Sequence, residues 1–330
     1  MPLIVPSRIV LRRATLLGAG LALALAGCAP VRDEPAPVPP DTAVVIPAPD
    51  TIARDTVAIA AFEPRYQRFA VRRPKRLRAL LDSIGPASTF EVLKLNRVDL
   101  EHIRDRDSLV VPEAFGDSLD FAPYPRAIAA LGDSAKMLLI SLRVQAFAAY
   151  DSGQLRRWGP TSTGRRDMPT PTGLYHTNWK DKSRISTFSD EWKLEWYVNL
   201  DNFQGVSLHE YELPGYPASH SCVRLLEADA IWMYSWAEQW RLAADRRVIT
   251  REGTPAVVFG EWTWGARAPW KRLPEGSLAT TIAAAEIDDA LRILRDRVKP
   301  VYPPRQARMV SVSGDSVGRK AAPVDSTGGR

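Results

Sequence analysis

The sequence predicts an α+β protein in which a mainly β domain, residues 136–265, is flanked by helices. Apolar runs at residues 137–144 and 146–150 have the composition of paired strands, and Asp-Ser-Gly at 151–153 supplies the next turn. A helix is expected after Cys222, because apolar residues recur there at helical spacing. These positions are Leu226, Ala230, Met233, Ala237 and Trp240.

The first residues have the layout of a secretory leader. Three arginines and no acidic residue precede an apolar run at 16–25, which is too short to span a bilayer in a folded product. We therefore expect residues 1–27 to be removed. The formal net charge then falls from +6 to +3, which is too small to indicate a nucleic-acid partner.

Cys28 ends a stretch, Leu-Ala-Gly-Cys at 25–28, that resembles the bacterial lipobox. The resemblance implies a lipidated Cys28 and an exported lipoprotein anchored in the cell envelope, since several acyl chains on one residue hold a membrane stably. Ala29 after the cysteine favours the outer membrane of a two-membrane cell, with the protein on the periplasmic side. An ordinary leader with an incidental cysteine is the alternative.

Two segments precede the β domain. Residues 28–60 are rich in proline and predict an extended tether, and residues 61–135 predict a small subdomain. A basic run at 65–78 is either a solvated helix face or a contact for anionic headgroups or wall polymer. Residues 92–97 and 107–112 resemble the second half of a LysM glycan-binding module; a plain helical subdomain is the alternative.

The residues near the end of the chain predict three further features. A strand at 257–260 closes the β domain, and 266–303 forms a C-terminal helical segment. Within that segment, apolar periodicity at 278–298 indicates an amphipathic helix that ends before Pro300. Residues 304–330 have the composition of a disordered tail.

Cys222 is the one cysteine left once Cys28 is assigned to lipid, so no intrachain disulfide is expected in this exported protein. A thiol of ordinary pKa is mostly protonated at neutral pH, so a cysteine nucleophile needs a nearby imidazole or helix N-terminus. His209 can reach Cys222 if the chain turns at 213–217. His220 would share its face in an extended chain, so the residues alone leave two candidate bases.

The backbone N–H groups of Ser221 and Cys222 are candidate oxyanion donors. Metal coordination by His209, His220 and Cys222 is a weaker alternative, because no fourth ligand accompanies them. No glycine-rich nucleotide pattern occurs, and no cofactor is expected. Aromatic side chains between the histidines are candidate substrate contacts, as is Tyr216; the candidates are Trp179, Trp192, Trp196 and Tyr197.

Residues 206–224, with Ser-Thr-Gly at 162–164 and Thr-Pro-Thr-Gly at 170–173, resemble the YkuD-type L,D-transpeptidase catalytic domain. That family's signature is an upstream histidine followed by Ser-His-Gly-Cys-Val/Ile-Arg. The resemblance implies a β-sandwich with a short helix beside the cysteine. It also implies a role for each matching residue: Cys222 as nucleophile, His209 as general base, and Ser219, His220 and Arg224 as pocket residues.

Two residues depart from the family pattern. Ser221 stands where the family has glycine, and Glu210 follows His209 where glycine or serine is more usual. We predict that Ser221 does not need a positive φ and that its N–H still serves the oxyanion. The implied reaction joins peptidoglycan stem peptides through a Cys222 thioester with loss of D-alanine. Hydrolysis by water, or a catalytically silent wall-binding lipoprotein, are the alternatives.

Overall fold

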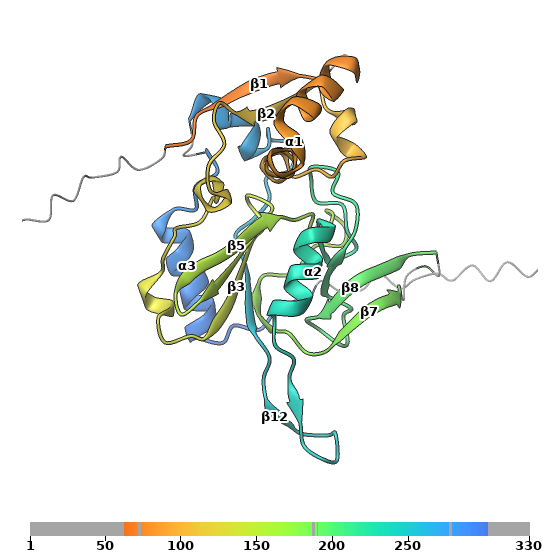
Figure 1. Ribbon diagram of the computed structural model, residues 1–330. Helices are drawn as coiled ribbons and strands as arrows, with labels where there is room; N and C mark the ends of the chain where they lie inside the picture. Colours follow the sequence, from red (N-terminus) through yellow and green to blue (C-terminus); the bar gives the residue numbers. More distant parts are fainter. Residues whose placement is uncertain (1–62, 72–73, 187–188, 190, 277–278, 303–330) are drawn as a thin grey trace, which may run out of the picture. The chain divides into compact units, whose positions relative to one another are not determined.

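The computed structural model describes residues 63–71, 74–186, 189, 191–276 and 279–302, which belong to one compact unit (Figure 1). The predicted leader, tether and tail, and Cys28 with them, lie outside the described residues. Among the described residues, no helix has the length and apolar content needed to cross a membrane. The described chain mixes several β-sheets with helices, so the predicted α+β class is confirmed.

The larger sheet has five strands in the order β5-β4-β3-β13-β6. The predicted strand pair at 137–150 is present as β3 and β4, which are antiparallel. Ser152 and Gly153 make the turn that follows, with φ of 50° and 72°. The strands are β3 (Lys136–Ser141), β4 (Ala146–Asp151), β5 (Gln154–Pro160), β6 (Gly173–His176) and β13 (Pro255–Phe259).

The smaller sheet has four strands in the order β10-β9-β8-β7 and positions the candidate site. Its last two strands, β9 and β10, are parallel, so the chain crosses over between them rather than folding back as a hairpin. The strands are β7 (Lys180–Ile185), β8 (Lys193–Asn199), β9 (Ser207–Glu210) and β10 (Val223–Leu225).

The two sheets form a sandwich because side chains alternate along β3. Leu138 and Ile140 pack into a buried cluster with Leu208 and Val223 of the smaller sheet. Met137 and Leu139 point to the opposite face and pack with residues of α3 (Ala284–Arg295). The five-stranded sheet is therefore covered on both faces, as the period of two along a strand requires.

The helix after the cysteine is α2 (Glu227–Trp236), and it starts later than predicted. Strand β10 lies between Cys222 and Glu227, so the thiol does not sit at a helix N-terminus. The helix also ends before Trp240, whose N–H donates to the Asn178 carbonyl at 2.9 Å. A short exposed hairpin, β11 (Arg241–Leu242) and β12 (Ile249–Arg251), follows.

Residues 66–112 form a strand–helix–strand unit: β1 (Tyr66–Ala70), α1 (Pro74–Asn96) and β2 (Ser108–Pro112), with β1 and β2 antiparallel. Gly85, at φ 76°, divides α1 into two helical parts, and Pro86 follows it. The first of these parts ends at this glycine. The unit packs on the sandwich through a cluster that includes Leu213 and Leu226.

The C-terminal helix is shorter than the periodicity at 278–298 predicts. It runs only from Ala284 to Arg295, and Glu286 Oε2 accepts the N–H of Ala283 at its start. Short 3₁₀ segments are η1 (His102–Asp105), η2 (Ser118–Phe121), η3 (Ala129–Leu131) and η4 (Pro269–Glu275).

Candidate active site

Cys222 and His209 lie on one face of the four-stranded sheet. The parallel register of β9 and β10 pairs Arg224 with His209 and Val223 with Leu208. Because side chains alternate along a strand, Arg224 and Cys222 share a face with His209 and Ser207. The crossover at 211–221 therefore brings the thiol and the predicted base to neighbouring positions.

The Cys222 thiol is held by the segment that leads into β9. Its S–H donates to the Gly205 carbonyl at 3.2 Å, and the Ser207 hydroxyl lies 3.2 Å from Sγ. With the single thiol proton committed to Gly205, the Ser207 hydroxyl is the donor to sulfur. The Ser207 backbone N–H also donates to Sγ, but burial dominates and raises the pKa of the Cys222 thiol.

His209 is held as a neutral base. It is 3% exposed, and its Nδ1 lies 2.7 Å from the Glu210 carbonyl, which accepts an N–H from that nitrogen. Nε2 is then the nitrogen with a free lone pair. Burial, opposed by the Glu210 carbonyl and helped by the charge of Arg224, lowers the pKa of His209 to about 4.

Ser221 adopts a left-handed backbone with φ 78°, so our prediction that this position needs no positive φ is wrong. Two contacts from the preceding loop hold it there. The Thr170 hydroxyl donates to the Ser221 carbonyl at 2.9 Å, and the Ser221 hydroxyl donates to the Met168 carbonyl at 3.2 Å. A non-glycine residue persists in this conformation when its surroundings fix it.

The extended chain that would place His220 on the face of the thiol is not formed, because the positive φ of Ser221 interrupts it. The His220 ring packs against Trp192, with ring centroids 4.8 Å apart. Burial and the charges of Arg165 and Arg224 lower the pKa of His220. Of the two candidate bases, His209 is the one on the sulfur's side of the sheet.

Ser219 supports the backbone around the nucleophile, whereas the charge of Arg224 acts on the thiol and partly offsets the rise in the pKa of Cys222 that burial causes. The Ser219 hydroxyl donates to the Cys222 carbonyl, and its N–H donates to Thr163 at 3.0 Å. Arg224 lies over the Tyr211 ring at 4.5 Å. The Ser-Thr-Gly and Thr-Pro-Thr-Gly stretches thus hold residues 216–221 in place, because their backbone and hydroxyl groups form hydrogen bonds with that loop.

The candidate aromatic substrate contacts lie in different surroundings. Trp196 packs edge-on against Tyr234 of α2, with ring centroids 5.6 Å apart, and it lies against the buried cluster between the two sheets. Tyr197 instead stacks on His209 at 6.3 Å between centroids. Tyr216 is exposed on the crossover loop, where its carbonyl accepts the Ser162 hydroxyl.

Sequence reasoning missed Ser207 and Gly205, the two residues whose contacts surround the sulfur. Ser207 could have been found, because it lies two residues before His209 and so shares its face of the strand. The Gly205 carbonyl has no sequence signal of this kind. Among the described residues, no group of three or more His, Cys, Asp and Glu side chains is arranged to hold a metal ion.

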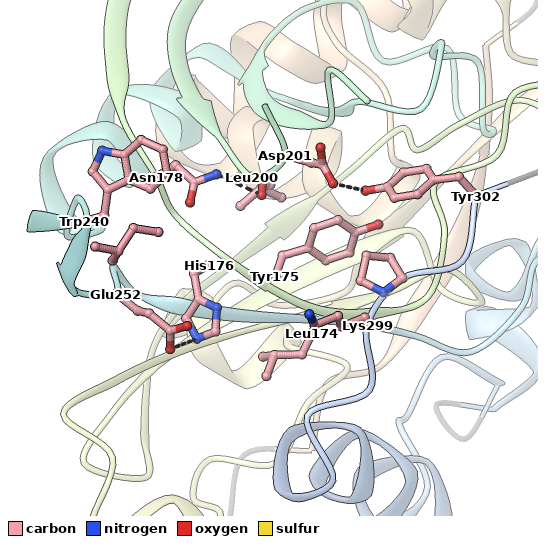
Figure 2. A pocket seen from close by; sticks show the side chains of 12 residues that line it. Leu174, Tyr175, His176, Asn178, Leu200, Asp201, Trp240, Glu252, Lys299 and Tyr302 are labelled. Carbon is pink, nitrogen blue, oxygen red and sulfur yellow. Dashed lines mark hydrogen bonds and ion pairs between the residues drawn. The ribbon is translucent and has the colours of Figure 1, made fainter. Parts of the chain in front are cut away.

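A cavity of about 290 Å³ lies beside β6 and is also lined by the end of β8, the residues around the β11–β12 hairpin and the C-terminal segment (Figure 2). Tyr302 and Asp201 form one of its walls through a hydrogen bond, and His176 pairs with Glu252 on another. No motif in the sequence predicts this cavity. Its lining includes Tyr175, Asn178, Leu200, Trp240, Lys299 and Pro300.

Around Cys222, a neutral imidazole shares a sheet face with a thiol, which is the combination that an activated cysteine nucleophile requires. Residues 135–277 match the YkuD family model, the L,D-transpeptidase catalytic domain. The resemblance drawn from the motifs of this segment is therefore confirmed at the level of the catalytic domain. The match begins one residue before our predicted domain and extends past its end to include all of η4.

Several solved structures are similar to part of the chain. An L,D-transpeptidase in complex with imipenem is 20% identical, with a TM-score of 0.30, over 38% of this chain and 59% of that one. An L,D-transpeptidase from Mycobacterium smegmatis is 19% identical, with a TM-score of 0.31 and the same coverage. One from Stackebrandtia nassauensis is 22% identical, with a TM-score of 0.32, over 39% and 57%. No curated protein matches the chain.

Proposed function

We propose that this chain is an L,D-transpeptidase that uses Cys222 to act on peptidoglycan stem peptides. Sγ attacks the carbonyl carbon of the stem's third residue, an L-centre, and the C–N bond to D-alanine breaks. The thiol proton passes to His209 and then to the leaving amine. An amine of a second stem attacks the thioester, which releases the thiol and forms the cross-link.

The observation that supports this proposal best is the pairing of thiol and neutral imidazole on one sheet face within the matched segment. His209 donates from Nδ1 to the Glu210 carbonyl, so Nε2 is available to take the thiol proton. The pKa directions favour a neutral pair at rest, since burial raises that of Cys222 and lowers that of His209. Proton transfer and carbon–sulfur bond formation are therefore expected to be coupled.

The Ser207 hydroxyl and N–H are suited to the thiolate that forms during this transfer, because both donate toward Sγ. The N–H groups of Ser221 and Cys222 are our candidate donors to the oxyanion. The left-handed Ser221 sets the direction of these groups, since it turns the backbone immediately before the nucleophile.

The proposal also covers the acyl acceptor, the export of the chain and its attachment to the membrane. Water in place of the amine would make the enzyme an L,D-carboxypeptidase. We further propose that the chain is exported and anchored by a lipid on Cys28. We also propose that the strand–helix–strand unit at 66–112 contacts the glycan. A silent wall-binding lipoprotein is the competing function, and the left-handed Ser221 is the observation that favours it.

Trapping the thiol with imipenem tests the proposal. Intact mass spectrometry of the native chain should show one added carbapenem, and the Cys222→Ser variant should show none. A native chain that folds but gains no mass would favour the wall-binding alternative. Peptide mapping of the adduct to residues 219–224 excludes modification elsewhere, and a folded Cys222→Ser chain excludes loss through misfolding.

A further inference from the structure

The C-terminal segment beyond α3 returns to the edge of the five-stranded sheet. The Val298 carbonyl accepts the Leu174 N–H at 2.7 Å, and Pro300 approaches Gly173 so closely that a Cβ there would lie 2.6 Å from its nitrogen. The segment is thereby fixed against β6. It ends, among the described residues, with Tyr302 on the wall of the cavity in Figure 2.

Tyr302 engages the turn between β8 and β9. Its hydroxyl donates to Asp201 Oδ2 at 2.6 Å, a bond drawn in Figure 2. The other carboxylate oxygen, Oδ1, accepts the N–H groups of Phe203 and Gln204 at 2.8 and 2.9 Å. The Asp201 carbonyl accepts the N–H of Gly205 at 3.2 Å, which closes the turn. One aspartate therefore orders the whole turn 201–205, and Tyr302 fixes that aspartate.

The end of this turn contacts the reactive sulfur, because the Gly205 carbonyl accepts the Cys222 S–H at 3.2 Å. A carbonyl oxygen in this place stabilises the protonated thiol and repels a thiolate. Its position therefore sets both the direction of the sulfur and the ease of its ionisation. A shift of the turn would change both.

A second connection runs from the same turn toward the base. Asn199 Nδ2 donates to the Asp201 carbonyl and to the Tyr197 hydroxyl, each at 3.3 Å. Tyr197 in turn stacks on His209. The turn thus contacts the surroundings of both reacting side chains, on one side through Gly205 and on the other through Asn199.

We propose that Tyr302 is a positioning residue for the Cys222 thiol, acting through Asp201 and the turn 201–205. Tyr302 lies outside the segment 135–277 that matches the catalytic-domain model. The C-terminal segment therefore completes the site from outside that domain. The inference rests on the proposed role of Cys222 as the nucleophile, but its test does not require turnover.

The test is the Tyr302→Phe change in the full chain, which removes only the hydroxyl. Tyr150→Phe is the matched control: it also removes a tyrosine hydroxyl, one bonded to the Pro125 carbonyl at 2.7 Å on the α3 face of the five-stranded sheet. Iodoacetamide alkylation of Cys222 as a function of pH gives the thiol pKa in each protein. The rate of imipenem acylation reports how well the sulfur is oriented.

With Tyr302→Phe we expect the pKa of the thiol to fall by about 0.5, or about threefold more thiolate at a fixed pH, because the Gly205 carbonyl is less firmly held. Imipenem acylation should nevertheless slow by about threefold or more, because the sulfur is less well oriented. A general loosening of the structure around Cys222 would instead speed both its alkylation by iodoacetamide and its acylation by imipenem. An unchanged thiol pKa in the folded variant, or an equal change in Tyr150→Phe, would overturn the inference.

The two proposals can fail separately. If the native chain neither reacts with imipenem nor releases D-alanine, the transpeptidase proposal fails, whereas the alkylation profile still decides whether Tyr302 positions the thiol. If the native chain is active and Tyr302→Phe matches it in both measurements, the positioning role fails and the proposed function stands.

Discussion

At the scale of single residues, the site depends on how each polar atom is paired. His209 is committed through Nδ1 to the Glu210 carbonyl, and Cys222 through its proton to Gly205. Ser221 is held in a conformation that its residue type disfavours. Each of these states has a measurable consequence.

The Ser221→Gly change should stabilise the protein, because glycine adopts the left-handed conformation without the steric cost of a Cβ. Ser221→Ala is the matched control, since it keeps the Cβ and loses the bond to Met168. Urea unfolding should rank the proteins Gly, Ser, Ala, with steps of about 1 kcal/mol. Imipenem acylation should change by less than about tenfold with glycine. An alanine variant as stable as the glycine variant would contradict the strain.

His209 should make stability depend on pH. Its pKa is lowered from 6.5 to about 4 in the folded protein, so the unfolded chain binds the extra proton between those values. Stability is therefore complete above pH 6.5 and falls as the pH drops toward 4, by at most about 3 kcal/mol. Urea unfolding at pH 7 and pH 4.5 measures the fall.

The matched variant is His209→Gln, which does not titrate in this range. It should show a smaller fall between the two pH values than the native chain. Equal falls in both proteins would mean that His209 is not the source of the pH dependence.

At the scale of elements, the loop 162–170 holds in place the loop 216–221, which precedes Cys222. A Cβ on Gly164 would lie 2.3 Å from the Met168 carbonyl oxygen and 2.4 Å from the Thr170 nitrogen. Both are backbone atoms, so the loop itself must move. Thr170 would then lose its hydrogen bonds with the Gly164 N–H and with the Ser221 carbonyl.

We therefore expect Gly164→Ala to cost about 1–3 kcal/mol of stability and to slow imipenem acylation. The control is Gly265→Ala, at φ 80° with nothing within 4 Å of its Cβ, which should cost about 1 kcal/mol and leave acylation unchanged. Urea unfolding and acylation kinetics provide the comparison. Acylation at the native rate in Gly164→Ala would show that the loop does not position Ser221.

Some elements were predictable from the sequence, and others were not. Strands β3 and β4 and the strand containing His209 were predictable, because their apolar runs and the turn residues beside them are local signals. The parallel pairing of β9 with β10 was not, since it depends on a crossover whose course is set by loop 162–170. The φ of Ser221 likewise depends on contacts with Thr170 and Met168, about fifty residues away along the chain.

At the scale of the whole molecule, the N-terminal unit and the sandwich share one interior. Arg97 is 1% exposed, and its Nε donates to the Val144 carbonyl at 2.9 Å. Its guanidinium also lies near the rings of Trp158 and Trp270. Burial lowers the pKa of Arg97 to about 9. The residue connects α1 to the turn after β3 and to η4.

Arg97→Met should therefore lower the free energy of unfolding by about 3 kcal/mol, because buried carbonyls lose their donors. Arg78→Met is the control, since that side chain is 86% exposed, and it should change stability by less than about 0.5 kcal/mol. Urea unfolding followed by tryptophan fluorescence measures both. An Arg97→Met chain as stable as the control would show that the N-terminal unit is not held through this residue.

The central claim, that Cys222 attacks the stem peptide, is tested most directly by D-alanine release from purified tetrapeptide stems. The native chain should release D-alanine, and folded Cys222→Ser should release none, because a hydroxyl with the same base is a far poorer nucleophile. Far-UV circular dichroism and urea unfolding confirm that the variant is folded. Release of D-alanine by Cys222→Ser at the native rate would contradict the thioester mechanism.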